Sequence, residues 1–288
     1  MFRLLRPRQW VKNLLVFAAP VFAKEIFVPA SLATALLAFA AFCIASSSVY
    51  VVNDLVDAER DRLHPDKRNR PIASGEVSQG KALALAALLS VAALGLSFWI
   101  GAGFGSVVVS YILLTHFYSF VGKNIVIVDI LIISTGFVLR AVAGALAIDV
   151  PFSGWFVLCT LFVALFVAIS KRKSELAGGG GMVENGARPV LAQYTENALT
   201  AFTGTSMAAA VISYSLYVQA IIEETGSELR LLAFTVPFVI FAVFRYYLLV
   251  DTGSLGEKPE EIFLRDRPFQ IGVLGFGVVA VAALYGAG

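Results

Sequence analysis

Charged residues are scarce in this sequence for its length. Asp, Glu, Lys and Arg make up 15% of the 288 residues, whereas a soluble domain carries about a quarter. Hydrophobic residues make up 58%, and the mean hydropathy is +0.82. Apolar runs of about 18 residues or more recur along the whole chain, and a run of that length can cross the hydrocarbon core of a bilayer. The lack of charge therefore excludes a soluble enzyme and predicts an all-α, multi-pass membrane protein.

Cysteine and histidine are almost absent. Cys43 and Cys159 lie far apart in apolar runs, and neither His64 nor His116 has a partner at metal-ligand spacing. We therefore expect no disulfide framework, no zinc site and no nucleophile activated by histidine. The net charge of +2 is small, and the chain has no dinucleotide-binding motif, so we also expect no nucleic-acid partner.

Nine helical spans are predicted from the apolar runs. Arg3, Arg6 and Arg8 precede the first run, but no convincing cleavage site follows it, which argues against a cleavable signal peptide. The first span is short and is interrupted by Pro20. The nine predicted spans cover residues 11–27, 32–53, 80–100, 104–121, 125–147, 153–170, 195–222, 230–250 and 268–286.

Lysine and arginine are distributed unevenly between the two sides of these spans. With the N-terminus placed in the cytoplasm, 18 of the 22 basic residues fall on the cytoplasmic side and only Lys24 and Arg230 on the other, while Arg140 and Arg245 lie within spans. The positive-inside rule then predicts a cytoplasmic N-terminus and an external C-terminus. We expect the protein to lie in the plasma membrane. We expect a single integral-membrane domain over residues 1–288, with long cytoplasmic connections at 54–79, 171–194 and 251–267.

Three aspartates and an asparagine lie close together at the cytoplasmic end of the second span. Asn53, Asp54, Asp57 and Asp61 follow one another at helical spacing, which places the three carboxylates within roughly 60° on one helix face. Like charges at such spacing repel one another. Mg²⁺ prefers oxygen ligands and takes one or two carboxylates together with water and substrate phosphates. The pattern therefore predicts a Mg²⁺–diphosphate site, in which we interpret all four residues as metal ligands and the three aspartates as catalytic.

Basic residues follow this aspartate stripe. Lys67, Arg68 and Arg70 come just beyond it, and their cationic groups suit phosphate oxygens. Proline at positions 65 and 71 predicts an ordered loop here and not a longer helix. We expect the three basic residues to bind the phosphates of the substrate.

A structural alternative stays open for this region. The charged residues at the end of an interfacial helix can simply pair with one another, as we expect for Glu59, Arg60 and Arg62. Such pairing does not require three carboxylates on the same helix face next to an asparagine, and their arrangement therefore favours the metal interpretation.

These motifs resemble those of a known family. "NDLVDAERD", at residues 53–61, followed by "HPDKRNRPIASG", at residues 64–75, is similar to the first aspartate motif of the UbiA superfamily of intramembrane prenyltransferases. The resemblance implies nine helices around a central cavity that opens to the cytoplasm and sideways to lipid. It also implies that the motif carries Mg²⁺ and a diphosphate, and relatives suggest a homo-oligomer.

Four further motifs resemble one branch of this superfamily. They are "RPRQWVKNLLVFAAP" at 6–20, "VDILIISTGFVLRAVAGALA" at 128–147, "KRKSEL" at 171–176 and "LRDRPFQ" at 264–270. Together they are similar to the decaprenyl-phosphate phosphoribosyltransferase branch. The resemblance implies transfer of 5-phosphoribose from phosphoribosyl diphosphate to decaprenyl phosphate with release of diphosphate. The product of that branch feeds the synthesis of cell-wall arabinan.

The second acidic motif of classical prenyltransferases is missing. Its place reads "SKRKSEL", in which we assign Lys171, Arg172 and Glu175 to substrate binding. Direct binding of an anion by basic residues fits a donor with an extra phosphate. A prenyl diphosphate donor with an aromatic acceptor is the first alternative, and it calls for the missing motif. An anion transporter is the second, and it predicts inverted repeats, of which we find none.

Three charged residues within or beside the spans complete the predicted substrate site. The resemblance implies that Lys12 contacts phosphate, although a lysine at this depth can serve topology alone. Asp129 lies at the cytoplasmic start of the fifth span, and an intramembrane carboxylate is by default a functional candidate. Arg140 follows about three turns later on the same face, where it either holds the lipid phosphate or forms a buried pair with a carboxylate.

Overall fold

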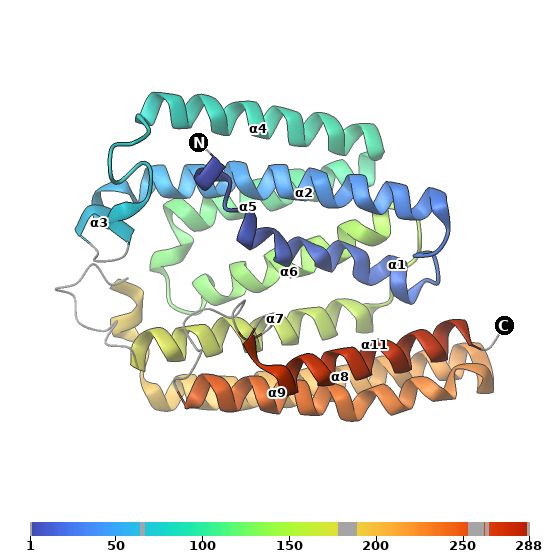
Figure 1. The fold of residues 1–288 in the computed structure, drawn as a ribbon. Coiled ribbons are helices and arrows are strands. Elements are labelled where there is room, and N and C mark those ends of the chain that lie inside the picture. The colour runs from blue at the N-terminus through green and yellow to red at the C-terminus, as the bar shows by residue number, and fades with distance from the viewer. Residues whose placement is uncertain (1, 64–66, 178–188, 253–261, 263–264, 287–288) are drawn as a thin grey trace. The chain divides into compact units, whose positions relative to one another are not determined.

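The computed structural model describes residues 2–63, 67–177, 189–252, 262 and 265–286, and within these ranges it contains helices and connecting turns but no strand (Figure 1). The all-α prediction is confirmed. Eight helices in the described part of the chain are long and apolar enough to cross a membrane. The chain forms two compact units, one of residues 1–152 and 180–193 and the other of residues 153–179 and 194–288, which are described separately below.

The first unit is arranged around one central helix. Helix α2 (Pro29–Val56) contacts α4 (Gln79–Ile100), α5 (Ala102–Phe120) and α6 (Val128–Ala147). The same helix also contacts the N-terminal 3-10 segments η1 (Phe2–Leu5) and η2 (Pro7–Phe17). The remaining elements of this unit are α1 (Ala18–Phe22), α3 (Ala58–Leu63), η3 (Lys67–Asn69), η4 (Gly122–Asn124) and η7 (Pro189–Gln193).

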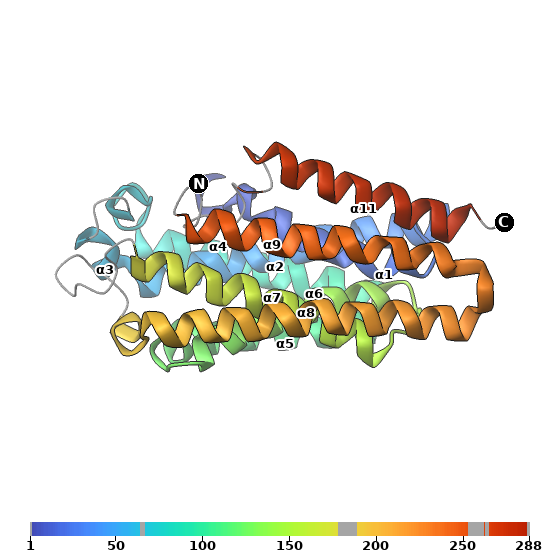
Figure 2. The same ribbon diagram turned by 90° about the horizontal axis from the view of Figure 1, so that it is seen from below.

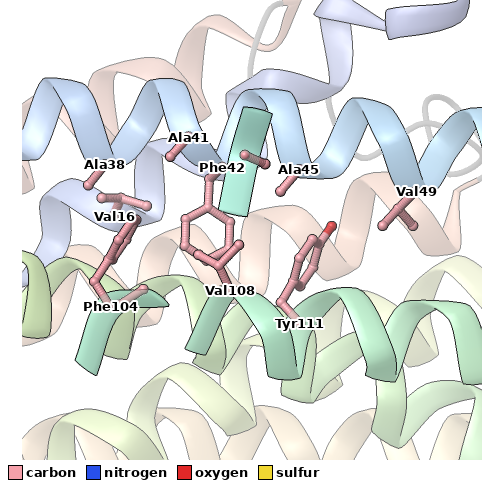
Figure 3. Packing of buried hydrophobic residues seen from close by; sticks show 11 residues of the cluster. Val16, Ala38, Ala41, Phe42, Ala45, Val49, Phe104, Val108 and Tyr111 are labelled. Carbon is pink, nitrogen blue, oxygen red and sulfur yellow. The ribbon is translucent and has the colours of Figure 1, made fainter. Parts of the chain in front are cut away.

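Small residues allow the helices to pack closely around α2. Ala38, Ala41 and Ala45 recur on one face of α2 and are fully buried, and such small side chains let membrane helices approach one another. Phe42 reaches from this face towards α5, where its ring lies 5.9 Å from that of Phe104 and 5.4 Å from that of Tyr111 (Figure 3). In α4, by contrast, only 17% of the residues in its most apolar stretch are buried, as expected of a helix that faces lipid.

The described part of the second unit contains four long helices. Helix α7 (Gly154–Glu175) packs against α8 (Glu196–Thr225) and α9 (Val236–Asp251). The 3-10 segment η8 (Gly226–Thr235) connects α8 to α9, and α11 (Arg267–Tyr285) packs against both η8 and α9 (Figure 2). Asp266 caps the start of α11, because its side chain accepts a hydrogen bond from the backbone N–H of Phe269 at 2.7 Å.

The eight long helices correspond to the second to ninth predicted spans, and the first span differs. Residues 11–27 were expected to form one helix, but the structure has η2 followed by the five-residue helix α1. Pro20 has no N–H to donate to an α-helical hydrogen bond. The side chains of Trp10 and Asn13 donate to serines of α2 and so attach η2 to that helix. A ninth membrane span and the central cavity therefore stay predictions.

The connection predicted from residue 171 is also wrong at its start. Helix α7 continues to Glu175, so "KRKSE" is helical. Lysine, arginine and glutamate are good helix formers, and Arg172 pairs with Glu175 across one turn. The run of charged residues after Ser170 therefore does not end α7.

Candidate active site

The aspartate stripe lies where α2 ends and α3 begins. Asp57 is the turn residue between the two helices, and its backbone N–H donates to the Asn53 carbonyl at 3.0 Å. The Asp61 N–H in turn donates to the Asp57 carbonyl at 2.8 Å. The helical bonding pattern therefore continues through the joint and holds the predicted carboxylates near one another.

Asp54 and Asp61 converge on one arginine. Arg70 donates from the same terminal nitrogen to Asp54 Oδ1 at 3.1 Å and to Asp61 Oδ2 at 2.6 Å. Arg6, from the N-terminal segment, also pairs with Asp54 Oδ1. Both carboxylates are only 3% exposed. Two arginines that are distant in sequence thus neutralise the buried carboxylates.

Asp57 belongs to a second cluster. Lys123, which lies buried in η4, donates to Asp57 Oδ1 at 2.5 Å, and the Asn53 amide donates to Asp57 Oδ2 at 3.1 Å. The hydroxyl of Ser119 donates to Asn53 Oδ1 at 3.2 Å and so fixes the orientation of the amide. The stripe predicted from sequence is therefore divided into two subsites, one around Asp54 and Asp61 and one around Asp57.

A polar pocket opens beside the first subsite. Its volume is about 200 Å³, and three of the side chains that line it are arginines. Arg3 holds its rim by donating to the carbonyl of Asn69 at 3.2 Å. The lining residues are Arg3, Arg6, Asp54, Asn69, Arg70 and Pro71. Concentrated guanidinium groups in a concave site suit an anion with several oxygens, such as a diphosphate.

The donor set fits a hard divalent cation. Among the described residues, no three acidic, histidine or cysteine side chains form a ready metal cluster. Each subsite nevertheless offers one or two carboxylates with oxygen donors only, which is what Mg²⁺ takes when water and phosphate oxygens supply the other ligands. Asn53, Asp54, Asp57 and Asp61 are thus able to hold such an ion in company with a phosphate ligand.

The other predicted residues of this unit are placed as follows. Lys67 is half-buried and Arg68 exposed in η3, which packs against α3. Lys12 is half-buried in η2. Asp129 is fully buried in the first turn of α6, where the helix dipole favours a negative charge.

Arg140 lies deep in α6 and is 5% exposed. Its partners are Asn13, Tyr111 and the carbonyl of Gly136. No carboxylate lies within 4.0 Å of it among the described residues, so the alternative of a buried pair with a carboxylate is wrong for that part of the chain.

The basic replacement of the second acidic motif lies in the second unit. Arg172 is 1% exposed and donates to Glu175 at 2.6 Å, while Lys171 is half-buried beside it. Lys173, which was not assigned to the site, donates to Asp251 at 2.6 Å and to the Tyr247 hydroxyl at 3.3 Å. The assignment of Lys171, Arg172 and Glu175 to substrate binding stays a prediction.

Sequence reasoning found Arg70 but missed the other two cations that contact the aspartates, Arg6 and Lys123. Arg6 enters the sequence argument only within the motif at 6–20, the basic residues before the first run and the count of basic residues, and Lys123 only within that count. One signal was available, because both lie in connections that the charge distribution placed on the same side as the stripe. The contact of Asn13 and Tyr111 with Arg140 had no signal in the sequence, since three separate segments supply these residues.

Known proteins resemble this chain over nearly its whole length. Three bacterial relatives carry the name decaprenyl-phosphate phosphoribosyltransferase. The one from Mycolicibacterium smegmatis is 41% identical over 99% of this chain and 92% of its own. The one from Corynebacterium glutamicum is 38% identical over 99% and 86%, and the one from Mycobacterium tuberculosis is 37% identical over 98% and 93%.

Solved structures share the fold. A UbiA homolog from Archaeoglobus fulgidus, bound to GPP and Mg²⁺, matches with a TM-score of 0.72 at 21% identity over 99% of this chain and 96% of its own. The same homolog bound to Cd²⁺ matches with a TM-score of 0.70 at 21% identity, over 98% of each chain. The model of the UbiA prenyltransferase family matches residues 14–258. The family expected from the aspartate motif is confirmed: the chain belongs to the UbiA prenyltransferase family.

Proposed function

We propose that this protein transfers 5-phosphoribose from phosphoribosyl diphosphate to a polyprenyl phosphate, with decaprenyl phosphate as the expected acceptor. Diphosphate is released, the reaction needs Mg²⁺, and the product serves the synthesis of cell-wall arabinan. The names of the relatives at 37% to 41% identity support the substrates. The observation that carries the chemistry is the pairing of three buried or half-buried aspartates with three cations. Two of these cations, Arg6 and Arg70, line a polar pocket together with Asp54.

The charge balance of this cluster suits a metal diphosphate. Asp54, Asp57 and Asp61 are neutralised by Arg6, Arg70 and Lys123. A bound metal diphosphate would offer the three carboxylates a metal partner and the three cations phosphate oxygens, in exchange for one another. Each buried charge keeps an opposite partner during this exchange, which avoids the large penalty of an unpaired buried charge.

The same residues act on the leaving group. The bond between ribose C1 and the diphosphate oxygen breaks, and negative charge grows on the diphosphate. We assign to Arg6, Arg70 and Lys123, which now pair with Asp54 and Asp57, the stabilisation of that charge through hydrogen bonds that strengthen in the transition state. Asn53, Asp54, Asp57 and Asp61 would hold Mg²⁺, which would supply further positive charge for the leaving diphosphate.

The acceptor needs no strong general base. An oxygen of the polyprenyl phosphate is already an anion, and it forms the new bond to C1 as the diphosphate departs. Holding the two substrates in line then supplies much of the rate. This agrees with a cluster of carboxylates and cations that contains no histidine or cysteine among its described members.

We also propose the setting of the site. The concentration of basic residues on one side of the spans supports a plasma-membrane protein whose N-terminus and active-site mouth face the cytoplasm and whose C-terminus is outside. The acceptor enters from the membrane. Homo-oligomer formation stays a prediction, which molar-mass measurement in detergent tests.

Transfer of labelled phosphoribose tests the proposal. Purified protein receives labelled phosphoribosyl diphosphate, decaprenyl phosphate and Mg²⁺, and we expect label in the lipid phase. Asp57→Asn should lose at least about 100-fold in rate, because it removes a proposed metal ligand. Glu59→Gln is the matched control, since it removes an exposed carboxylate in α3. Equal losses in both variants would contradict the proposed role of the stripe.

A prenyl transfer assay covers the first alternative function. Transfer of a prenyl group from a prenyl diphosphate to an aromatic acid, without phosphoribosyl transfer, would refute the proposed substrates while leaving the family and the metal site in place.

A further inference from the structure

Arg140 is held by neutral partners from three segments. Its Nε donates to Asn13 Oδ1 at 2.8 Å, and its two terminal nitrogens donate to the Gly136 carbonyl at 2.7 Å and to the Tyr111 hydroxyl at 2.8 Å. The guanidinium carbon also lies 4.6 Å from the centre of the Tyr111 ring. These contacts fix the position of the guanidinium but provide no negative charge.

The missing counter-charge sets Arg140 apart. Arg245, the other arginine predicted within a span, pairs through two nitrogens with Asp266. Within the described ranges, Arg140 has no such carboxylate. A charged side chain at this depth in a membrane is unfavourable and usually marks a functional site. The guanidinium has five N–H groups, so the three bonds above leave capacity for a further acceptor.

The surrounding backbone holds this guanidinium rigidly. A Cβ built on Gly144 of α6 would lie 2.0 Å from the carbonyl oxygen of Val16, so only glycine lets η2 come this close to α6. The close approach brings Asn13 of η2 to Arg140. Asn13 in turn donates to Ser46 of α2 at 3.1 Å. Tyr111 belongs to the packed core of α2 and α5 (Figure 3).

The position along α2 relates this group to the aspartate cluster. Asn13 bonds both the Arg140 guanidinium and Ser46 of α2, so the guanidinium lies beside Ser46. Asp54 follows Ser46 by eight residues, or about 12 Å along the helix axis. The guanidinium therefore lies further from the predicted cytoplasmic end of α2 than the proposed diphosphate site does. A phosphoribosyl group and the attacking phosphate together can span this distance.

We propose that Arg140 binds the phosphate of the polyprenyl phosphate acceptor, with Asn13 and Tyr111 as positioning residues. The proposal rests on the proposed function and names the site of its second substrate. An acceptor anchored by its chain in the hydrocarbon must bring a doubly ionisable phosphate into a poorly solvated region. A fixed guanidinium with spare donors and no carboxylate partner compensates that loss of hydration.

Asn13→Asp is the decisive variant, because it introduces the missing carboxylate. If the only role of Arg140 is to hold η2 against α6, an ion pair with Asp at position 13 preserves that contact and leaves acceptor binding unchanged. If Arg140 binds the acceptor, the carboxylate competes with the phosphate. We then expect the KM for decaprenyl phosphate to rise about 10- to 100-fold, with the KM for phosphoribosyl diphosphate unchanged. An unchanged acceptor KM would overturn the proposal.

Binding without the donor separates this proposal from the proposed function. Farnesyl phosphate, farnesol and inorganic phosphate are compared by thermal shift on the purified protein. We expect stabilisation of the wild type by farnesyl phosphate alone, and its loss in Asn13→Asp and Arg140→Gln. The matched control, Arg245→Gln, removes an arginine that has a carboxylate partner and should keep the shift.

Each result has a defined meaning. Stabilisation by farnesol, or an Arg140-dependent shift with inorganic phosphate alone, overturns the proposal, because the first needs no anion and the second needs no lipid. A farnesyl phosphate shift that survives both variants also overturns it. A shift that depends on Arg140, in a protein that transfers no phosphoribose, supports the anion site and refutes the proposed function.

Discussion

The pair of Lys123 and Asp57 offers a quantitative test of how the aspartate cluster is stabilised. Lys123 Nζ lies 2.5 Å from Asp57 Oδ1, and the two side chains are 7% and 17% exposed. Lys123→Met retains the apolar stem but removes the charge. Loss of one partner from a buried pair typically costs about 3–5 kcal/mol. The remaining hydrogen bond from Asn53 and the partial exposure of Asp57 reduce the expected loss to about 2–3 kcal/mol.

A double-mutant cycle isolates the pair itself. Lys123→Met, Asp57→Asn and the double variant are compared by reversible unfolding in mixed micelles. Removing both partners leaves no unpaired charge. The double variant should therefore lose less free energy of unfolding than the two single variants lose in sum, with a coupling energy of about 1.5–3 kcal/mol. The control cycle uses Lys173 and Asp251, whose carboxylate is 47% exposed and whose coupling should stay below about 1 kcal/mol. A coupling below about 0.5 kcal/mol for Lys123 and Asp57 would refute the reasoning.

Three further predictions concern packing, protonation and metal. Gly144→Ala should lower the free energy of unfolding by about 1–3 kcal/mol, because the new Cβ would meet the Val16 carbonyl. The control variant Gly95→Ala has open space around it in α4 and should be neutral or stabilising. Equal changes in the free energy of unfolding of the two variants would contradict the close approach of η2 to α6. The hydrogen bond from Arg245 holds the pKa of Asp266 below its ordinary value, so the stability it contributes is present at neutral pH and is lost as the pH falls through that lowered pKa. Thermal unfolding of the wild type and Asp266→Asn across acidic pH checks this, and identical profiles would contradict it. EDTA should abolish transfer and Mg²⁺ restore it, whereas full activity in EDTA would exclude a metal role for the stripe.

The sequence predicted the elements that depend on long apolar runs. Eight of the nine spans appear as long helices, because burial of an apolar face or exposure to lipid decides each of them locally. The first span and the end of α7 were misjudged. In the first, the chain forms the 3-10 segment η2 and the short helix α1, and Pro20 has no N–H for an α-helical hydrogen bond. In α7, an ion pair between Arg172 and Glu175 extends the helix through charged residues.

The carboxylates of the candidate site and Arg70 were predictable from the sequence, but Arg6 and Lys123 were not. Asp54 and Asp61 share one helical face, so their spacing predicts that the two carboxylates lie close together, and Arg70 contacts both. The contacts of Arg6 and Lys123 depend on how distant segments pack, and no local pattern encodes them. The same holds for Arg140, whose partners became clear only when η2, α5 and α6 were placed together.

A direct comparison of donors tests the central claim. Wild-type protein in detergent with Mg²⁺ receives either labelled phosphoribosyl diphosphate with decaprenyl phosphate, or labelled prenyl diphosphate with an aromatic acid. The account predicts label in a phosphoribosyl lipid in the first reaction, released diphosphate in equal amount, and no product in the second. Product in the second reaction alone would contradict phosphoribosyl transfer.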